Sequence, residues 1–184
     1  MKRKNFFVAM LLLTGFILSF NSCKKGENDP SISLKSRDAR ITAKWKLTKI
    51  EATEVHTWGT TTSTTTTAYD GTIYTQTNTG SPSTSATGSY EMTIDKQGQV
   101  SWSENYTESG GDADIKSGEG QWGWMNSDKN KEFIWIDGGY NLFEGGMFYV
   151  DRLASKELIL HYTYKYVNNG NTNSNDEKYT FTKQ

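Results

Sequence analysis

The chain is short of cysteine, of proline and of any dominant charge. Its 184 residues include one cysteine, Cys23, so no disulfide can form within it. It has two prolines, and after Phe20 no segment shows the 3.6-residue apolar period of an amphipathic helix. Twenty Lys and Arg against 21 Asp and Glu give a formal net charge of −1, which supplies no electrostatic reason to expect nucleic acid as a partner. These absences exclude a disulfide scaffold and disfavour a helical or nucleic-acid-binding protein.

The N-terminus has the pattern of an export signal. A basic start, Lys2-Arg3-Lys4, precedes an apolar-rich run from Phe6 to Phe20 and the small residue Ser22. The run rises about 1.5 Å per residue as a helix and falls short of the roughly 30 Å hydrocarbon core, so we do not expect a permanent transmembrane helix. We therefore expect residues 1–22 to be a signal peptide.

The sole cysteine stands at the cleavage junction. The run from Phe20 to Cys23 resembles a lipobox, the recognition sequence of lipoprotein signal peptidase. This resemblance implies that Cys23 becomes the acylated N-terminus, and acyl chains contribute about 0.8 kcal/mol per CH₂ buried in a membrane. The other interpretation is an ordinary secretory signal with an incidental cysteine. An aspartate directly after the lipidated cysteine commonly retains lipoproteins at the inner membrane, but here that position is Lys24. We therefore expect the outer membrane, and leave undecided whether the domain faces the periplasm or the cell exterior.

Residues 23–40 are polar and charged and predict a flexible tether from the lipidated cysteine. From residue 41 apolar residues alternate with polar ones, which is the pattern of a half-buried strand. We therefore expect a single domain over residues 41–184.

Short alternating segments with polar turns continue to the C-terminus. They predict strands around residues 41–48, 90–94, 100–106, 118–124, 133–136, 147–153, 158–166 and 179–181, with a polar loop over 168–176. Two-residue apolar alternation joined by short turns is typical of an up-and-down barrel or a closed sandwich. The fold class that we predict is an all-β, up-and-down antiparallel barrel of about eight strands.

One segment within this domain, residues 57–88, has little apolar content and is crowded with Thr, Ser and Gly. Threonine favours extended backbone because its branched Cβ restricts χ1, and Asp70-Gly71 is a common hairpin turn. The segment therefore predicts either a long, solvated hairpin or a disordered loop, and the two interpretations remain open.

Several strand signatures are similar to a known family. They are Ala43-Lys44-Trp45-Lys46-Leu47, the stretch from Gly118 to Trp124, the stretch from Phe148 to Leu160, and the closing residues 179–183. Together they resemble the lipocalin-like domain of Bacteroidota cell-envelope lipoproteins. The resemblance implies a barrel and assigns Trp45 the role of closing its bottom by packing; it implies no catalytic residue.

Aromatic residues are the strongest site signal. Seven of them stand at alternate positions of three predicted strands, which places each strand's set on one face: Trp102, Tyr106, Trp122, Trp124, Tyr162, Tyr164 and Tyr166. They either fill the core or line a cup for a small apolar ligand. A different interpretation is a cell-envelope interaction module, in which the Thr-rich segment contacts a protein or a glycan around a filled barrel.

An enzyme is not expected. The two histidines, His56 and His161, have no second ligand at metal spacing, and no Gly-x-Ser-x-Gly elbow is present. Gly118-Glu119-Gly120 leads into a strand rather than a phosphate-binding helix. We therefore predict no catalytic site, no metal and no cofactor.

Overall fold

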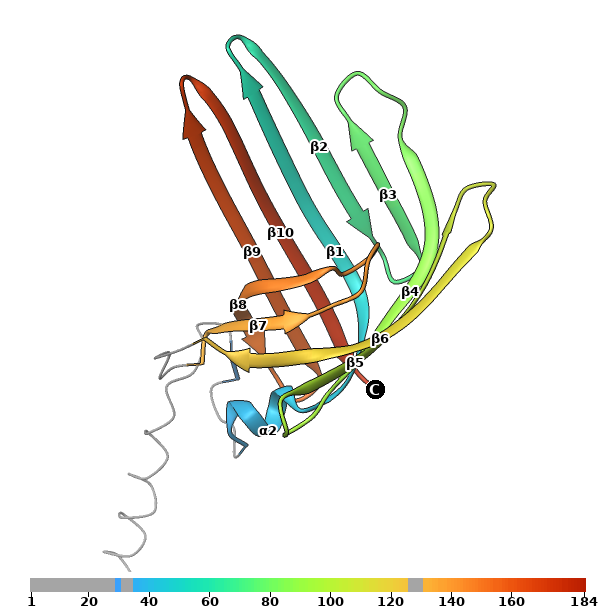
Figure 1. The fold of residues 1–184 in the computed structure, drawn as a ribbon, viewed down its shortest axis with the longest axis vertical. Coiled ribbons are helices and arrows are strands. Elements are labelled where there is room, and N and C mark those ends of the chain that lie inside the picture. The colour runs from blue at the N-terminus through green and yellow to red at the C-terminus, as the bar shows by residue number, and fades with distance from the viewer. Residues whose placement is uncertain (1–28, 31–34, 126–130) are drawn as a thin grey trace, which may run out of the picture.

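The computed structural model describes residues 29–30, 35–125 and 131–184, and over these ranges the chain forms a closed antiparallel barrel of ten strands with one short helix, α2 (Arg37–Ile41). Figure 1 shows the strands following one another around the barrel. They are β1 (Ala43–Trp58), β2 (Thr61–Tyr69), β3 (Ile73–Asn78), β4 (Thr84–Ile94), β5 (Gln99–Glu108), β6 (Ala113–Trp124), β7 (Phe133–Asp137), β8 (Gly145–Leu153), β9 (Glu157–Asn168) and β10 (Asn171–Lys183). The predicted fold class, an all-β up-and-down barrel, is confirmed. The predicted signal peptide and Cys23 lie outside the described residues.

Strand β1 has two different neighbours along its length. Its first residues, Ala43–Lys46, pair with the end of β4, whereas residues 50–58 pair with β2. The β2–β3 hairpin is therefore inserted between β1 and β4 only along the later part of β1. Eight strands close the ring at the lower end, close to the predicted number, and the hairpin widens the ring above it.

The Thr-rich segment 57–88 is extended, and the hairpin interpretation is confirmed. Asp70 makes the turn between β2 and β3, because its Oδ1 accepts the backbone N–H of Thr72 at 2.9 Å and of Ile73 at 2.8 Å. Gly71 has a φ of +97°, a value that side-chain-bearing residues rarely adopt. The turn thus lies at the predicted Asp-Gly pair, although the connection between the strands spans residues 70–72 rather than two residues.

The predicted loop at residues 168–176 was wrong, since residues 171–176 belong to β10. Only Asn169 and Gly170 turn the chain, both with positive φ. Asn171 to Asp176 pair residue by residue with β9 on one side and, from Thr172 onward, with β1 on the other. Strand pairing on both edges overrides the weak strand preference of Asn, Ser and Asp.

The predicted tether is also too long. Residues 37–41 form α2, whose N-cap Ser36 accepts the backbone N–H of Ala39 at 3.2 Å. Arg37 and Arg40 are buried, and both pair with Asp29, whose side chain is fully buried. We refer to Asp29, Arg37 and Arg40 as the basal lock. The ordered domain therefore includes Asp29 and begins before residue 41.

The long hairpins rise above one end of the barrel, whereas α2 lies under the other (Figure 1). Trp45, fully buried, donates its Nε1–H to the carbonyl of Ile41 at 2.7 Å and so joins β1 to α2. We call the α2 end the closed end and the opposite end the open end.

Candidate functional site: a cup at the open end

The inner face of the barrel changes character from the closed end to the open end. On β1 the inward residues run from Trp45 and Leu47, both fully buried, to Ala52 and Glu54. On β10 they run from the buried Phe181 through Tyr179 to Glu177. The lower half is therefore a packed apolar core, and the upper half carries small and polar side chains that cannot fill it.

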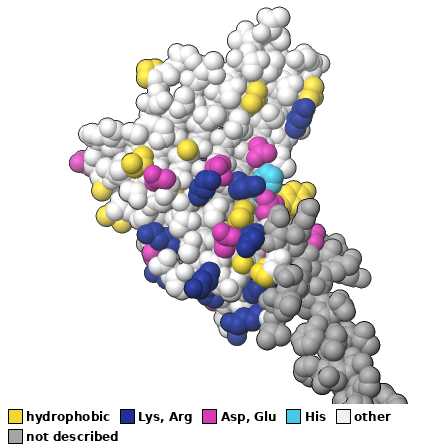
Figure 2. Space-filling model, turned by 180° about the vertical axis from the view of Figure 1, so that it is seen from behind, with side chains coloured by type: hydrophobic (Ala, Val, Ile, Leu, Met, Phe, Trp, Pro, Cys, Tyr) yellow, Lys and Arg dark blue, Asp and Glu magenta, His cyan; other side chains and the backbone are white. Residues whose placement is uncertain are grey.

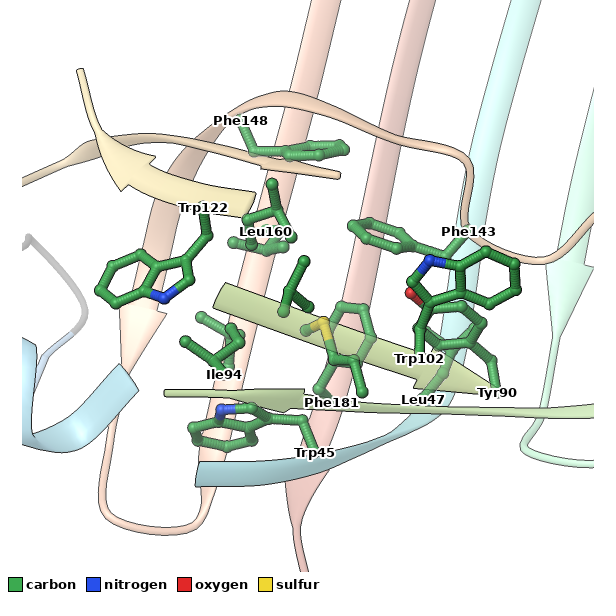
Figure 3. Close-up of a cluster of buried hydrophobic side chains, with 14 of the residues drawn as sticks. Trp45, Leu47, Tyr90, Ile94, Trp102, Trp122, Phe143, Phe148, Leu160 and Phe181 are labelled. Carbon is green, nitrogen blue, oxygen red and sulfur yellow. The ribbon is translucent and has the colours of Figure 1, made fainter. Parts of the chain in front are cut away.

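A loop between β7 and β8 separates the two halves. We call residues 138–144 the plug loop. It inserts Phe143, which is 1% exposed, among Tyr90, Phe148, Tyr179 and Phe181, with ring centroids 5.2–5.4 Å apart. Figure 3 shows Phe143 and Phe148 on the opposite side of this cluster from Trp45. The plug loop thus forms the floor of the open half.

A buried carboxylate holds the plug loop in place. Glu104 on β5 is 2% exposed and accepts the backbone N–H groups of Tyr140, Asn141 and Leu142. Three N–H donors satisfy an anion that would otherwise be costly to bury. Because β5 lies in the barrel wall, this contact fixes the height of the floor.

Above the floor lies a cavity of about 450 Å³. Its base is apolar, formed by Ile50, Leu142 and Phe148. Its walls come from β1, β2, β3, β9 and β10, with Ala52, Thr65, Thr67, Tyr74, Tyr162 and Glu177 among the lining residues. We call this cavity the cup. Its volume lies within the range of small-molecule sites, roughly 300–1,000 Å³.

The cup has a negative wall. Its lining includes Glu54, Glu144 and Glu177 but no Lys, Arg or His. Glu177 accepts the Tyr179 hydroxyl at 2.5 Å and the Asn175 amide at 2.6 Å, both neutral donors. Burial raises the pKa of the Tyr179 hydroxyl, and the charges of Glu177 and Glu144 raise this pKa further. The hydroxyl therefore stays protonated and donates to Glu177 at neutral pH.

Of the seven predicted lining aromatics, the structure places one in the cup. Tyr162 lines it, while Tyr164 and Tyr166 follow on the same face of β9 toward the hairpin tip, 43% and 51% exposed. Tyr166 lines a second, shallower cavity of about 230 Å³ with His56 and Trp58. Tyr106 packs edge-on against Tyr74, a cup residue, at 6.0 Å. The β9 tyrosines thus extend from the cup to the rim.

The three predicted tryptophans lie elsewhere. Trp102 packs beneath the plug loop against Tyr90 and Tyr140. Trp122 donates its Nε1–H to the carbonyl of Asp95, and Trp124 donates to Asp38 of α2, so both belong to the closed end. Trp122 and Trp124 are on β6, which runs antiparallel to β5. The later residues of β6 therefore lie at the end of the barrel away from the cup.

The carboxylates of the cup were missed by sequence reasoning. Glu54 and Glu177 look like ordinary surface residues of polar segments. Their positions carry a signal, however: Glu54 has the same parity as the inward Ile50 and Ala52, and Glu177 the same parity as Tyr179 and Phe181. Extending the alternation beyond the apolar residues would have placed both inside the barrel.

The histidines face other polar groups. His161 lies on the outer face of β9, 3.5 Å from Asp151 and 3.3 Å from Asp176, as the parity of its strand predicts. His56 Nε2 lies 2.9 Å from Glu54. Among residues 29–30, 35–125 and 131–184, no three His, Cys, Asp or Glu side chains come together as a metal site. Over the same ranges no helix is long and apolar enough to cross a membrane.

Comparison with known proteins gives no relative: no family model, no curated protein sequence and no solved structure matches the chain.

Proposed function

We propose that this chain is an outer-membrane lipoprotein, anchored through acylated Cys23, whose lipocalin-like barrel binds a small molecule in the cup. The cup carries the binding half of this proposal, since a cavity of about 450 Å³ stands open above an ordered floor. Its apolar base, formed by Ile50, Leu142 and Phe148, suits the apolar body of a ligand, although only Tyr162 of the predicted aromatics lines the cup. The lone cysteine after the apolar run supports the anchor.

A cup-filling variant tests the binding half. Thr67 on β2 lines the cup, whereas its neighbour Thr66 is exposed and does not line the cup. The full chain is purified from membranes, and an organic extract and native mass spectrometry are used to find a co-purifying molecule. We expect this molecule in the wild type and in Thr66→Trp but not in Thr67→Trp. A molecule retained by Thr67→Trp contradicts binding in the cup.

Metabolic labelling tests the anchor. Cells are grown with a clickable fatty-acid analogue, and the wild type is compared with Cys23→Ser. We expect label on the wild type alone, with the variant accumulating as unprocessed precursor. An unlabelled wild type contradicts the lipoprotein assignment and leaves the cup unaffected.

The exposed rings at the hairpin tips favour the second candidate, an interaction module for an envelope protein or glycan. Trp58 at the β1–β2 tip is 54% exposed, and Tyr166 and Val167 stand exposed near the β9–β10 tip. The face seen in Figure 2 carries few charged side chains over its upper part. Deleting residues 60–84 would not separate the candidates, because Thr65, Thr67 and Tyr74 of this hairpin also line the cup. The double variant Trp58→Ala, Tyr166→Ala, compared with the wild type by cross-linking on whole cells, leaves the cup lining intact and tests the tips alone.

A further inference from the structure

We propose that the ligand of the cup is a small organic cation, an amine or quaternary ammonium with an apolar body. This inference rests on the proposed function and names the ligand class of the same site. It starts from a cavity whose lining combines an apolar base, aromatic rings and three carboxylates with no basic side chain.

The register places two of the carboxylates on neighbouring strands within one wall. Glu177 on β10 lies opposite Ala52 on β1 and opposite Tyr162 on β9. Glu54 lies two residues further along β1, opposite Asn175. Glu177 thus lies between the small side chain of Ala52 and the ring of Tyr162, and all three line the cavity.

The third carboxylate comes from the plug loop. Glu144 is exposed at the end of this loop, directly before Gly145 at the start of β8. Among the described residues, neither Glu144 nor Glu177 takes part in a salt bridge, and the only basic partner of Glu54 is His56 beyond the cup. The negative charge of the cup therefore has no internal counter-charge. Concave sites of one sign concentrate ions of the opposite sign.

The rest of the cup decides what kind of cation fits. A bare metal ion needs several converging ligands, and no such group occurs in the described part of the chain. An organic cation needs only one carboxylate: it can place its apolar body on Leu142 and Phe148 and its charged head against a carboxylate of the wall. Aromatic faces such as that of Tyr162 attract ammonium groups as well. An anionic ligand would meet repulsion from all three carboxylates.

The test uses matched probes that differ in charge. Choline is compared with its uncharged isostere, in which carbon replaces nitrogen, and phenethylamine with phenylethanol and phenylacetate. Binding to the detergent-solubilised full chain is followed by titration calorimetry and by amide chemical shifts of cup residues. We expect the two cations to bind, with affinity falling as salt rises, and the neutral and anionic members to bind at least about tenfold more weakly.

Three charge variants accompany the probes. Glu177→Gln keeps the size of the side chain but leaves one acceptor oxygen for the two donors Asn175 and Tyr179, so urea denaturation checks that the variant is folded. Glu144→Gln changes an exposed residue at the end of the plug loop. Each is expected to weaken cation binding about tenfold or more. The control is Glu51→Gln, since Glu51 is exposed, pairs with Lys49 at 2.8 Å and does not line the cup. It should leave the affinity unchanged.

Each other outcome has a distinct meaning. Neutral or anionic probes that shift cup residues as strongly as the cations overturn the charge inference and leave the cup as a binding site. Cation binding that survives both Glu177→Gln and Glu144→Gln overturns it too. If no probe shifts cup residues and a co-purifying molecule lost in Thr67→Trp is uncharged, only the cation inference fails. If no probe binds and nothing co-purifies, both proposals fail.

Discussion

The carboxylate of Glu104 accepts the backbone N–H of Leu142, so a residue of the barrel wall fixes the loop that forms the floor of the cup. Glu104→Gln keeps the side-chain shape but replaces one acceptor oxygen with an N–H donor that faces other donors. We expect the free energy of unfolding to fall by about 1–3 kcal/mol in urea denaturation. Hydrogen exchange of Asn141 and Leu142 should accelerate. Glu108→Gln, on an exposed position of the same strand, is the control, and an equal loss there would contradict this role.

A glycine on β6 makes room for a tryptophan of the core. A Cβ added to Gly118 would lie 2.6 Å from Cζ2 of Trp102. Gly118→Ala should therefore overpack this region and lower the free energy of unfolding by about 1–3 kcal/mol. Gly111→Ala, where the nearest atom is 3.5 Å away, should have a much smaller effect. Equal melting temperatures for the two variants would show that Trp102 moves aside freely.

The basal lock holds two buried guanidinium groups on one carboxylate. Asp29 Oδ2 lies 3.4 Å from Arg37 Nε and 3.0 Å from Arg40 Nη2, and Asp29 Oδ1 accepts the backbone N–H of Leu153 at 2.7 Å. Asp29→Ala leaves buried positive charge without its partner and should cost about 3–5 kcal/mol in denaturation. Asp112→Ala, at an exposed turn, is the comparison. Proteolysis that cuts near α2 no faster in Asp29→Ala would contradict the lock.

Alkaline pH should destabilise the barrel through its buried tyrosines. Burial raises the pKa of Tyr69 to about 12 from the ordinary 10.0, and its hydroxyl donates to the carbonyl of Gly88 at 2.9 Å. Because the folded state holds this proton more tightly, its contribution is complete below pH 10 and is lost as pH rises from 10 through 12. Burial shifts the pKa of Tyr90 in the same direction.

Unfolding curves at several pH values, with tyrosinate absorbance, measure this loss. Tyr69→Phe removes one hydrogen bond, worth about 0.5–1.5 kcal/mol at neutral pH, and should show a shallower alkaline fall than the wild type. Tyr149→Phe changes an exposed ring and should follow the wild-type curve. Identical slopes for Tyr69→Phe and the wild type would contradict the assignment.

Two-residue alternation was enough to predict the barrel. Segments such as Tyr90–Ile94 and Leu158–Tyr166 place apolar residues on one face, and the structure contains each as a strand. The Asp70-Gly71 pair located a turn for the same local reason. Where one face of a strand is apolar, the alternation in the sequence was enough to predict that strand.

Long-range contacts decided the parts that were missed. Asn171 to Asp176 have no apolar face, and only pairing with β9 and β1 makes them a strand. The helix α2 has five residues and depends on the basal lock, which joins Asp29 to residues distant along the chain. The cup needs the plug loop, whose position depends on Glu104. Asp29 and Glu104 lie far along the chain from most of the groups that they hold, so no local pattern predicted these contacts. The turn into β10 is different, because Asn169-Gly170 is itself a local hairpin signal that sequence reasoning passed over.

The basal lock also limits how the barrel stands on a lipid surface. Five residues separate Cys23 from Asp29, so the two Cα atoms can lie at most about 22 Å apart, and Asp29 is fixed to the closed end. With Cys23 acylated, as we propose, this short segment keeps the closed end next to the bilayer. The open end of the barrel then faces the aqueous phase. A ligand would then enter the cup from that aqueous phase rather than from the membrane.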